Sequence, residues 1–519
     1  MNIKIILKQK VGLALLLITI LGAGCKKGTF DINNNPNTAT SVDPKYTLSS
    51  TLTNTANLIY GGTANTTSNS PGGGSYTDVL NNWMGYWTQG GGYTPSTTYV
   101  LYQLNSSSYN SNWNFAYINL KNYNLLLTES GTTPSQANYR AISMIMTAFV
   151  YQRIVDLYNN APYSQASTTN AQFSYKYDDA STIYQSCIAK LDSAVTIISA
   201  NSSAATSPGN YDIMFKGDMT KWRKFAKTLK LKMLMRQTQG GIGSAAVKTA
   251  LSSMTTADFL AAGEDAAINP GYSNASDAQE NPFYYDVIAN AVGSNGYNTL
   301  YFRANSYAAN FYNNNNDPRV TCFYAPIASG KVVGRTYGAT TADPNANISA
   351  IRGTGYTTTG VLKGSNQDAV ILPAFESLFL QAEAIQRGYL GGTVATTYKS
   401  AVSESFRILG VTNYAAAAET YTSQANALTN LSNSSNALQT IITQKWAACN
   451  TYDPLESYSD WRRLGIPTDL PVSIYPGNTA THIPYRLPYP ASEISYNSAN
   501  VPSGGTANDI LTSKIFWMP

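Results

Sequence analysis

Charged side chains are scarce in this sequence. Asp, Glu, Lys and Arg make up 12% of its 519 residues, which is about half of the ~25% that is usual in soluble domains. Asn, Ser, Thr, Gly and Tyr take their place, so we expect a neutral and polar surface. Nucleic-acid binding requires clustered Lys and Arg that neutralise phosphates. A chain with so little charge is therefore not expected to bind nucleic acid.

Histidine and cysteine are nearly missing as well. The single histidine, His482, lies in the proline-rich segment THIPYRLPYP and cannot supply a multi-histidine metal site. Four cysteines are present, but the sequence contains no CxxC pair and no HExxH, GxSxG or Walker motif. Cys187 and Cys449 fall at apolar helix positions, which is typical of buried cysteines. We therefore expect no metal, no cofactor and no catalytic residue, and a surface or packing role for His482.

Glycoside hydrolysis needs only two carboxylates, so missing motifs do not exclude it. Glu376 and Glu383 share one face of an expected helix, but seven residues at ~1.5 Å each separate them by about 10.5 Å along its axis. Retaining enzymes need a separation of about 5 Å, and inverting enzymes at most about 9.5 Å. Asp453, Glu456 and Asp460 remain open to pairing with other carboxylates. A surface glycoside hydrolase is kept as the lowest-ranked alternative.

Long apolar runs are rare, and the one at the N-terminus is typical of a secretion signal. Three lysines precede the run VGLALLLITILGAG at residues 11–24, which is too short for a comfortable membrane span. It ends in LGAG directly before Cys25, and this ending resembles a bacterial lipobox, whose cysteine is lipidated. We predict a lipoprotein signal peptide over residues 1–24, lipidation of Cys25, and a flexible lipidated tether over residues 25–44. Several acyl chains on one cysteine anchor a protein stably, so the membrane is reached through the lipid anchor only.

Helical periodicity dominates the remaining chain. Apolar residues recur at steps of three and four, which is typical of amphipathic helices. Asp218 can cap one of these helices, and Gly388 can end another. We expect helices at residues 135–158, 178–199, 219–237, 373–388, 394–410 and 435–449. Long stretches without a period lie at residues 200–217, 260–365 and 450–519. The predicted fold is mostly α, with long loop-rich elaborations on a helical frame.

The helix expected at residues 219–237 is strongly basic. Its seven Lys and Arg residues are open to two interpretations, a membrane or nucleic-acid stripe and an ordinary solvated face. Trp222 and Phe225 define an apolar stripe on this helix, and cations suit its C-terminal end. We expect the basic residues to form a solvated face.

The segment NNWMGYWTQGGGYTPSTTYVLYQLNSSSYNSNWNFAY, residues 81–117, is rich in aromatic rings and has no charged residue. The rings follow no single period, and a run of three glycines interrupts them, so some must lie on loops. A sugar has an apolar C–H face that stacks on such rings, and hydroxyls that pair with Asn, Gln and Tyr. We predict that four of the rings bind ligand: Trp87, Tyr93, Tyr99 and Tyr102. Three others are assigned to the core: Trp83, Trp113 and Tyr117.

Several sequence blocks carry a resemblance to a known family. They occur in order along the chain and include DLYNNAPYSQA (156–166), GDMTKWRKFAKTLKLKMLMR (217–236), QKWAACNTYDPLESYSDWRRLGIP (444–467) and YRLPYPASEISYNSANV (485–501). Together they resemble the SusD/RagB family of outer-membrane nutrient-binding lipoproteins, in its SusD-like subgroup. The first and the last of these blocks are the most specific.

The resemblance implies a single ligand-binding domain over residues 45–519, built on tetratricopeptide-like helix pairs. It implies a non-catalytic glycan-binding protein, lipid-anchored in the outer membrane and facing the cell exterior. Such a protein delivers oligosaccharide, or another neutral polar nutrient, to a SusC-like TonB-dependent transporter. A peptide-capturing RagB-like binding protein is the alternative. Ligand residues are not part of the shared blocks, so none is carried over. Four shared residues are expected to be structural: Trp222, Glu383, Trp446 and Trp461.

Overall fold

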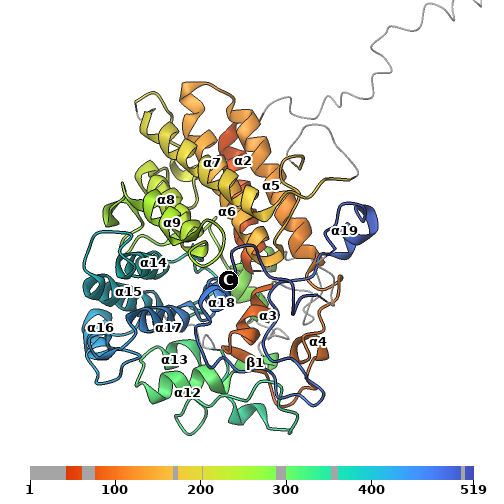
Figure 1. Ribbon diagram of the computed structural model, residues 1–519, viewed down its shortest axis with the longest axis vertical. Helices are drawn as coiled ribbons and strands as arrows, with labels where there is room; N and C mark the ends of the chain where they lie inside the picture. The colour runs from red at the N-terminus through yellow and green to blue at the C-terminus, as the bar shows by residue number, and fades with distance from the viewer. Residues whose placement is uncertain are drawn as a thin grey trace, which may run out of the picture. The chain divides into compact units, whose positions relative to one another are not determined.

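Helices that pack side by side, many of them consecutive in sequence, form most of the structure (Figure 1). The computed structural model describes residues 42–60, 76–166, 174–200, 203–287, 300–351, 360–503 and 509–519. The expected signal peptide, Cys25 and most of the tether lie outside these residues. The longer helices are α2 (Pro44–Tyr60), α5 (Asn110–Ser130), α6 (Ala137–Tyr158), α7 (Ala180–Ala200), α8 (Met219–Arg236), α14 (Ala374–Gln386), α15 (Val394–Leu409), α17 (Ala437–Cys449) and α18 (Pro454–Leu464). The shorter helices are α3 (Tyr76–Trp83), α4 (Thr97–Val100), α9 (Gly243–Leu251), α10 (Pro282–Val287), α12 (Ser306–Asn314), α13 (Val320–Phe323), α16 (Tyr414–Thr422) and α19 (Ala491–Tyr496).

The long helices form two runs of neighbouring pairs. In the first run, α5 packs against α6, α6 against α7, and α7 against α8. In the second, α14 packs against α15 and α17, and α17 packs against α18. Contacts of α8 with α14 and α18 join the two runs. This arrangement confirms the predicted fold class, a mostly α scaffold of helix pairs with long loops.

Each of the six helices expected from periodicity is present, and the two ends assigned to Asp218 and Gly388 have the expected geometry. The Asp218 carboxylate accepts the backbone N–H groups of Thr220 and Lys221 and so caps α8. Gly388, just beyond the end of α14, has φ +70°, a left-handed conformation that glycine adopts without strain. The α6 helix is buried almost all round, as its sequence, with apolar residues on nearly every side, predicts.

Two short antiparallel ribbons attach the long loops to the helices. Strand β1 (Trp87–Gln89) pairs with β3 (Phe302–Ala304), with Thr88 opposite Arg303. Strand β2 (Ala266–Ile268) pairs with β4 (Ala369–Leu372). Each ribbon joins segments that lie about a hundred residues or more apart in sequence, so it fixes loops that local periodicity could not place.

Tyrosine hydroxyls also hold the loops together. The hydroxyl of Tyr86 donates to the carbonyl of Trp446 at 2.6 Å, and that of Tyr337 donates to the carbonyl of Tyr99 at 2.8 Å. Further hydroxyls donate to backbone carbonyls in the same way: Tyr117 to Pro162, Tyr312 to Ala447, Tyr324 to Tyr86, Tyr398 to Thr429, and Tyr489 to Asn160. A buried carbonyl without a partner costs about 1–3 kcal/mol. Tyrosine therefore provides the polar partners that irregular backbone lacks.

Candidate functional site

Three of the four rings predicted to bind ligand lie in the core. Trp87, Tyr99 and Tyr102 are 2%, 2% and 3% exposed. The indole N–H of Trp87 donates to the Thr451 hydroxyl at 3.2 Å, and the Tyr102 hydroxyl accepts the backbone N–H of Ser473 at 2.9 Å. Protein atoms cover these rings, so they offer no face to a ligand. The prediction of ligand contact by these three residues is therefore corrected to a packing role.

A buried carboxylate explains why Tyr99 points inward. The hydroxyls of Tyr99 and Tyr109 each donate to the carboxylate of Asp78 at 3.0 Å, and the Tyr109 hydroxyl also reaches the Tyr99 hydroxyl. Burial raises the pKa of Asp78 to about 7, and the hydrogen bonds from the two tyrosines oppose this rise. The ring-rich segment thus supplies polar contacts to an acid inside the fold.

Tyr93 is the one residue of the predicted four that is partly exposed. Its ring meets Tyr301 edge to face, with the centroids 5.4 Å apart. The preceding glycines let the chain pass close to a neighbouring loop, because a Cβ on Gly91 would lie 2.0 Å from the carbonyl oxygen of Asp343. Ligand contact by Tyr93 stays a prediction.

The carboxylates considered for hydrolysis meet in the core. Oxygen atoms of Glu376, Asp453 and Glu456 lie within 4.8 Å of one another, close enough to hold a metal ion. The ammonium of Lys232 occupies their centre instead. Its Nζ lies 2.8 Å from Glu376 and 3.3 Å from Asp453, and 3.0 Å from Glu456. Lys232 and Arg236 are buried, so the expectation that all basic residues of α8 form a solvated face is corrected.

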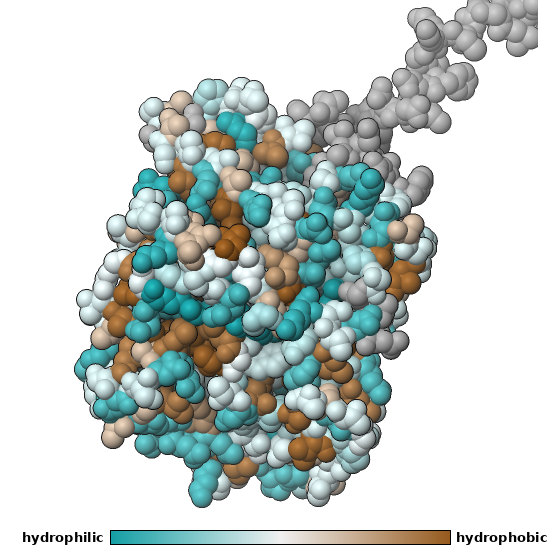
Figure 2. All heavy atoms as spheres, viewed as in Figure 1, coloured by the Kyte–Doolittle hydropathy of each residue, from teal (hydrophilic) through white to brown (hydrophobic). Residues whose placement is uncertain are grey.

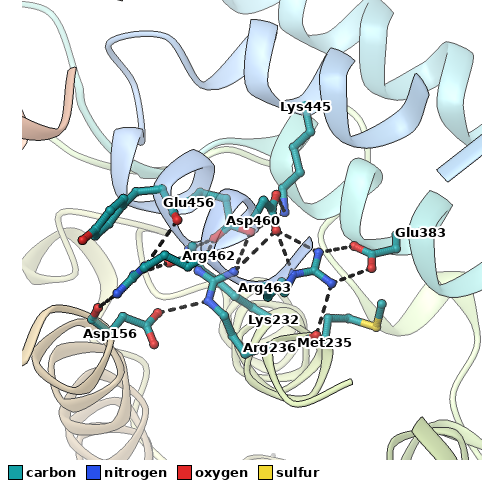
Figure 3. A network of polar contacts seen from close by, with 12 residues as sticks. Asp156, Lys232, Met235, Arg236, Glu383, Lys445, Glu456, Asp460, Arg462 and Arg463 are labelled. Carbon is teal, nitrogen blue, oxygen red and sulfur yellow. Dashed lines mark hydrogen bonds and ion pairs between the residues drawn. The ribbon is translucent and has the colours of Figure 1, made fainter. Parts of the chain in front are cut away.

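A larger network of buried charges surrounds this centre (Figure 3). Arg236 pairs with Asp156 and Glu456. Arg463 pairs with Glu383; burial opposes ionisation of that acid, but the guanidinium outweighs burial and lowers the pKa of Glu383 to about 2. In the part of the chain that the structure describes, the network holds six cations and six carboxylates: Arg153, Lys232, Arg236, Lys445, Arg462 and Arg463, with Asp156, Glu376, Glu383, Asp453, Glu456 and Asp460. It cross-links five helices, and its six carboxylates are buried, so a sugar chain in solvent does not meet them.

An open cleft lies at the C-terminal end of α18. It has a volume of about 450 Å³, and its walls include Trp461, Tyr485, Gln239 and Lys514. Figure 1 shows the C-terminal end of the chain beside α18, and Met518 lines the cleft. Figure 2 shows this face mostly in the teal and white of polar residues, with brown apolar residues gathered over α17 and α18. The volume is in the range of ~300–1,000 Å³ that small-molecule sites occupy.

A row of four rings, each stacked on the next, runs outward from the core, and its two middle rings line this cleft. Tyr458 is buried, and Trp461 lies parallel to it at 6.4 Å with an angle of 10° between the rings. Trp461 and Tyr485 follow at 6.0 Å and 28°, and His482 stacks on Tyr485 at 4.4 Å and 15°. The outer three rings are half-buried. Trp461, which is expected to be structural, packs against the core and also lines this open cleft.

The outer rings keep polar groups available. Among the described residues, neither the indole N–H of Trp461 nor the hydroxyl of Tyr485 has a hydrogen-bond partner. Arg462 fixes the backbone at this point, since its guanidinium donates to the carbonyl of Tyr485 at 3.0 Å. Burial lowers the pKa of Arg462 to about 10. The cleft therefore combines a stacking surface with free donors on a rigid support, which suits a polar ligand that has one apolar face.

A frame of paired helices that carries long loops and an open ring-lined cleft defines a helical binding scaffold. The SusD-like family model, described as "Starch-binding associating with outer membrane", matches residues 36–490. The chain belongs to the SusD/RagB family, in its SusD-like subgroup.

Solved structures have the same fold. A SusD homolog from Bacteroides fragilis is 19% identical, with a TM-score of 0.71 over 92% of this chain and 99% of its own. A SusD/RagB family protein from Bacteroides thetaiotaomicron is 21% identical, with a TM-score of 0.66 over 92% and 99%. A chitin-binding SusD homolog from Flavobacterium johnsoniae is 20% identical, with a TM-score of 0.68 over 91% and 98%. A search of curated proteins finds no match.

Proposed function

We propose that the protein is a cell-surface glycan-binding protein that captures oligosaccharide without cleaving it. The observation that carries the proposal is the open cleft in which Trp461 and Tyr485 present half-buried rings and unpaired donors. A sugar ring stacks through its C–H face on such rings, while its hydroxyls accept from the indole and phenol groups and bind the amide of Gln239. The family description and the chitin-binding relative support this ligand class.

The affinity of this cleft is expected to be modest. Two rings and a few donors bury little ligand surface, and association has to offset the lost translational and rotational freedom. Modest affinity suits a protein that must release its ligand to a transporter. Tyr93, with its partly exposed ring near Tyr301, is proposed as an additional ligand contact.

The anchor and the partner are part of the same proposal. Lipidation of Cys25 places the protein on the outer membrane facing the cell exterior, and a SusC-like TonB-dependent transporter receives the ligand. The lipobox-like sequence and the family membership support this arrangement. In the described residues, no helix is both long and apolar enough to cross a membrane.

Two alternatives follow from the same surface. Peptide capture, as in RagB-like proteins, would use the cleft with backbone amides in place of sugar hydroxyls. A surface glycoside hydrolase is disfavoured because Glu376, Asp453 and Glu456 are buried and ion-paired with Lys232. These carboxylates cannot flank a glycosidic bond in solvent.

The experiment separates capture from cleavage. The chain from residue 26 onward, which lacks the proposed lipid site, is incubated with a panel of polysaccharides and peptides. Binding is followed by affinity electrophoresis, and reducing ends are measured over time. Retardation by a polysaccharide without new reducing ends supports capture. Sustained release of reducing sugar, or retardation by peptides alone, overturns the proposal.

A further inference from the structure

A second open cleft lies where the β2–β4 ribbon meets the C-terminal end of α15. Its volume is about 470 Å³. Ala267 and Val370 of the ribbon and Ile408 of α15 supply apolar wall, and the half-buried ring of Tyr452 adds an aromatic one. None of these residues belongs to the Trp461–Tyr485 cleft.

Lys363 gives this cleft a cation that forms no ion pair with any carboxylate of the described residues, although Asp265 and Asp368 lie near it. Its Nζ donates to the carbonyl of Ile408 at 2.7 Å, which is its single hydrogen bond to any described residue. An ammonium has three donors, so two remain for a ligand. Burial lowers the pKa of Lys363 and the neighbouring Arg407 lowers it further, while Asp265 and Asp368 oppose this fall without cancelling it. A partly buried cation whose bonded partner is a carbonyl, and not a carboxylate, is in a setting that favours an added anion.

Arg407 stands beside Lys363 with its own charge balanced. Its Nε lies 2.6 Å from Glu404, and its Nη2 lies 2.5 Å from Asp265. The Nη1 atom of Arg407 has no partner within the described ranges, so it is a further donor at the cleft wall. Asp368 also lines the cleft, but it is exposed, and water and salt screen its charge.

We propose that this cleft binds the carboxylate of a small acidic sugar, with Lys363 as the main contact and Arg407 as a second donor. The apolar wall and Tyr452 face the sugar ring, and the exposed amide of Asn366 serves its hydroxyls. A neutral sugar of the same shape leaves the ammonium without its anion. The selectivity of the cleft therefore depends on one functional group of the ligand.

The test compares sugars that differ only at that group. Galacturonate and glucuronate are titrated calorimetrically into the chain from residue 26 onward, next to galactose and glucose. At least one acid is expected to bind ten-fold or more tightly than its neutral counterpart, and added salt should weaken it. Equal binding of acid and neutral sugar, or no binding of either acid at tens of millimolar, would overturn the proposal.

Substitutions at Lys363 test whether the acidic sugar binds in this cleft. Lys363→Met removes the ammonium and keeps much of the stem, and it should weaken the acid at least ten-fold. Lys363→Arg should restore binding, which separates lost charge from lost fold. Lys248→Met, on the exposed side of α9, is the matched control and should change nothing. If Lys363→Met binds the acidic sugar as tightly as wild type, Lys363 is not its main contact. Trp461→Ala should leave acid binding intact, so failure here and failure of the Trp461–Tyr485 cleft are distinguishable.

Discussion

Replacement of Lys232 by methionine tests the charge network most severely. The ammonium contacts Glu376, Asp453 and Glu456 at 2.8–3.3 Å, all out of contact with water. Among the described residues Glu376 has no other ion partner, and its Oε2 has no hydrogen bond. Breaking a buried pair from one side costs about 3–5 kcal/mol, because the remaining charge stays buried. Methionine fills similar volume, so the cavity contributes little. We expect Lys232→Met to lower the free energy of unfolding by about 3–5 kcal/mol at pH 7.

Urea denaturation followed by tryptophan fluorescence measures this loss. The matched control is Lys248→Met, an exposed change that should stay within about 0.5 kcal/mol of wild type. Burial raises the pKa of Glu376 to about 7 against the pull of Lys232. Without the lysine this acid takes up a proton more readily, so the deficit of the variant should shrink at pH 5. The double variant Lys232→Met/Glu376→Gln should recover part of it. A loss below about 1 kcal/mol, equal at pH 5 and pH 8, would refute the reasoning.

Other predictions concern the buried rings and the acid between them. Burial raises the pKa of Asp78 from its ordinary 3.8 to about 7, so the stability that this group contributes is complete below its ordinary pKa and is lost as the pH rises through about 7. Asp78→Asn should therefore gain unfolding free energy relative to wild type between pH 5 and pH 8, and a constant difference in denaturation curves would count against it. Trp222→Ala should cost about 3–5 kcal/mol without changing sugar affinity in calorimetry. Tyr99→Ala should likewise lose stability and keep affinity, and weaker binding at unchanged melting temperature would restore this ring to the ligand site.

Local periodicity was enough to predict six of the nine longer helices that the structure describes, but not α2, α5 or α18. The stripe of Trp222, Phe225 and Leu229 on α8 repeats at helical spacing, and it is buried. The cap by Asp218 depends on residues two and three positions away. These signals are all contained within one turn or a few turns of chain, so sequence alone carries them.

Whether the aromatic rings of residues 81–117 are buried depends on partners that lie far along the chain. Tyr86 reaches a carbonyl 360 residues away, and Tyr337 reaches one 238 residues away. A glycine break and an absent period show that a ring lies on a loop, but they do not show whether the loop is buried. The abundance of tyrosine in a chain poor in charge was the available signal. In this chain, tyrosine hydroxyls form hydrogen bonds of the kind that charged side chains and regular backbone groups form in other proteins.

The α18 helix was missed for a related reason. Its sequence PLESYSDWRRL is mostly polar, yet nearly all of it is buried, because its charges pair with residues far along the chain. Glu456 meets Arg236, 220 residues away. The same helix carries Trp461 to the open cleft, which no local pattern distinguishes from a core position.

Calorimetric titration of an oligosaccharide that the wild-type protein binds, into Trp461→Ala, tests the central claim most directly. The matched control is Tyr496→Ala, which removes an exposed ring on α19 that does not line the cleft. Loss of ring stacking should weaken binding by about 1–3 kcal/mol, with the variant still folded at the temperature of the titration and the control variant equal to wild type. Wild-type affinity in Trp461→Ala would contradict capture at the Trp461–Tyr485 cleft.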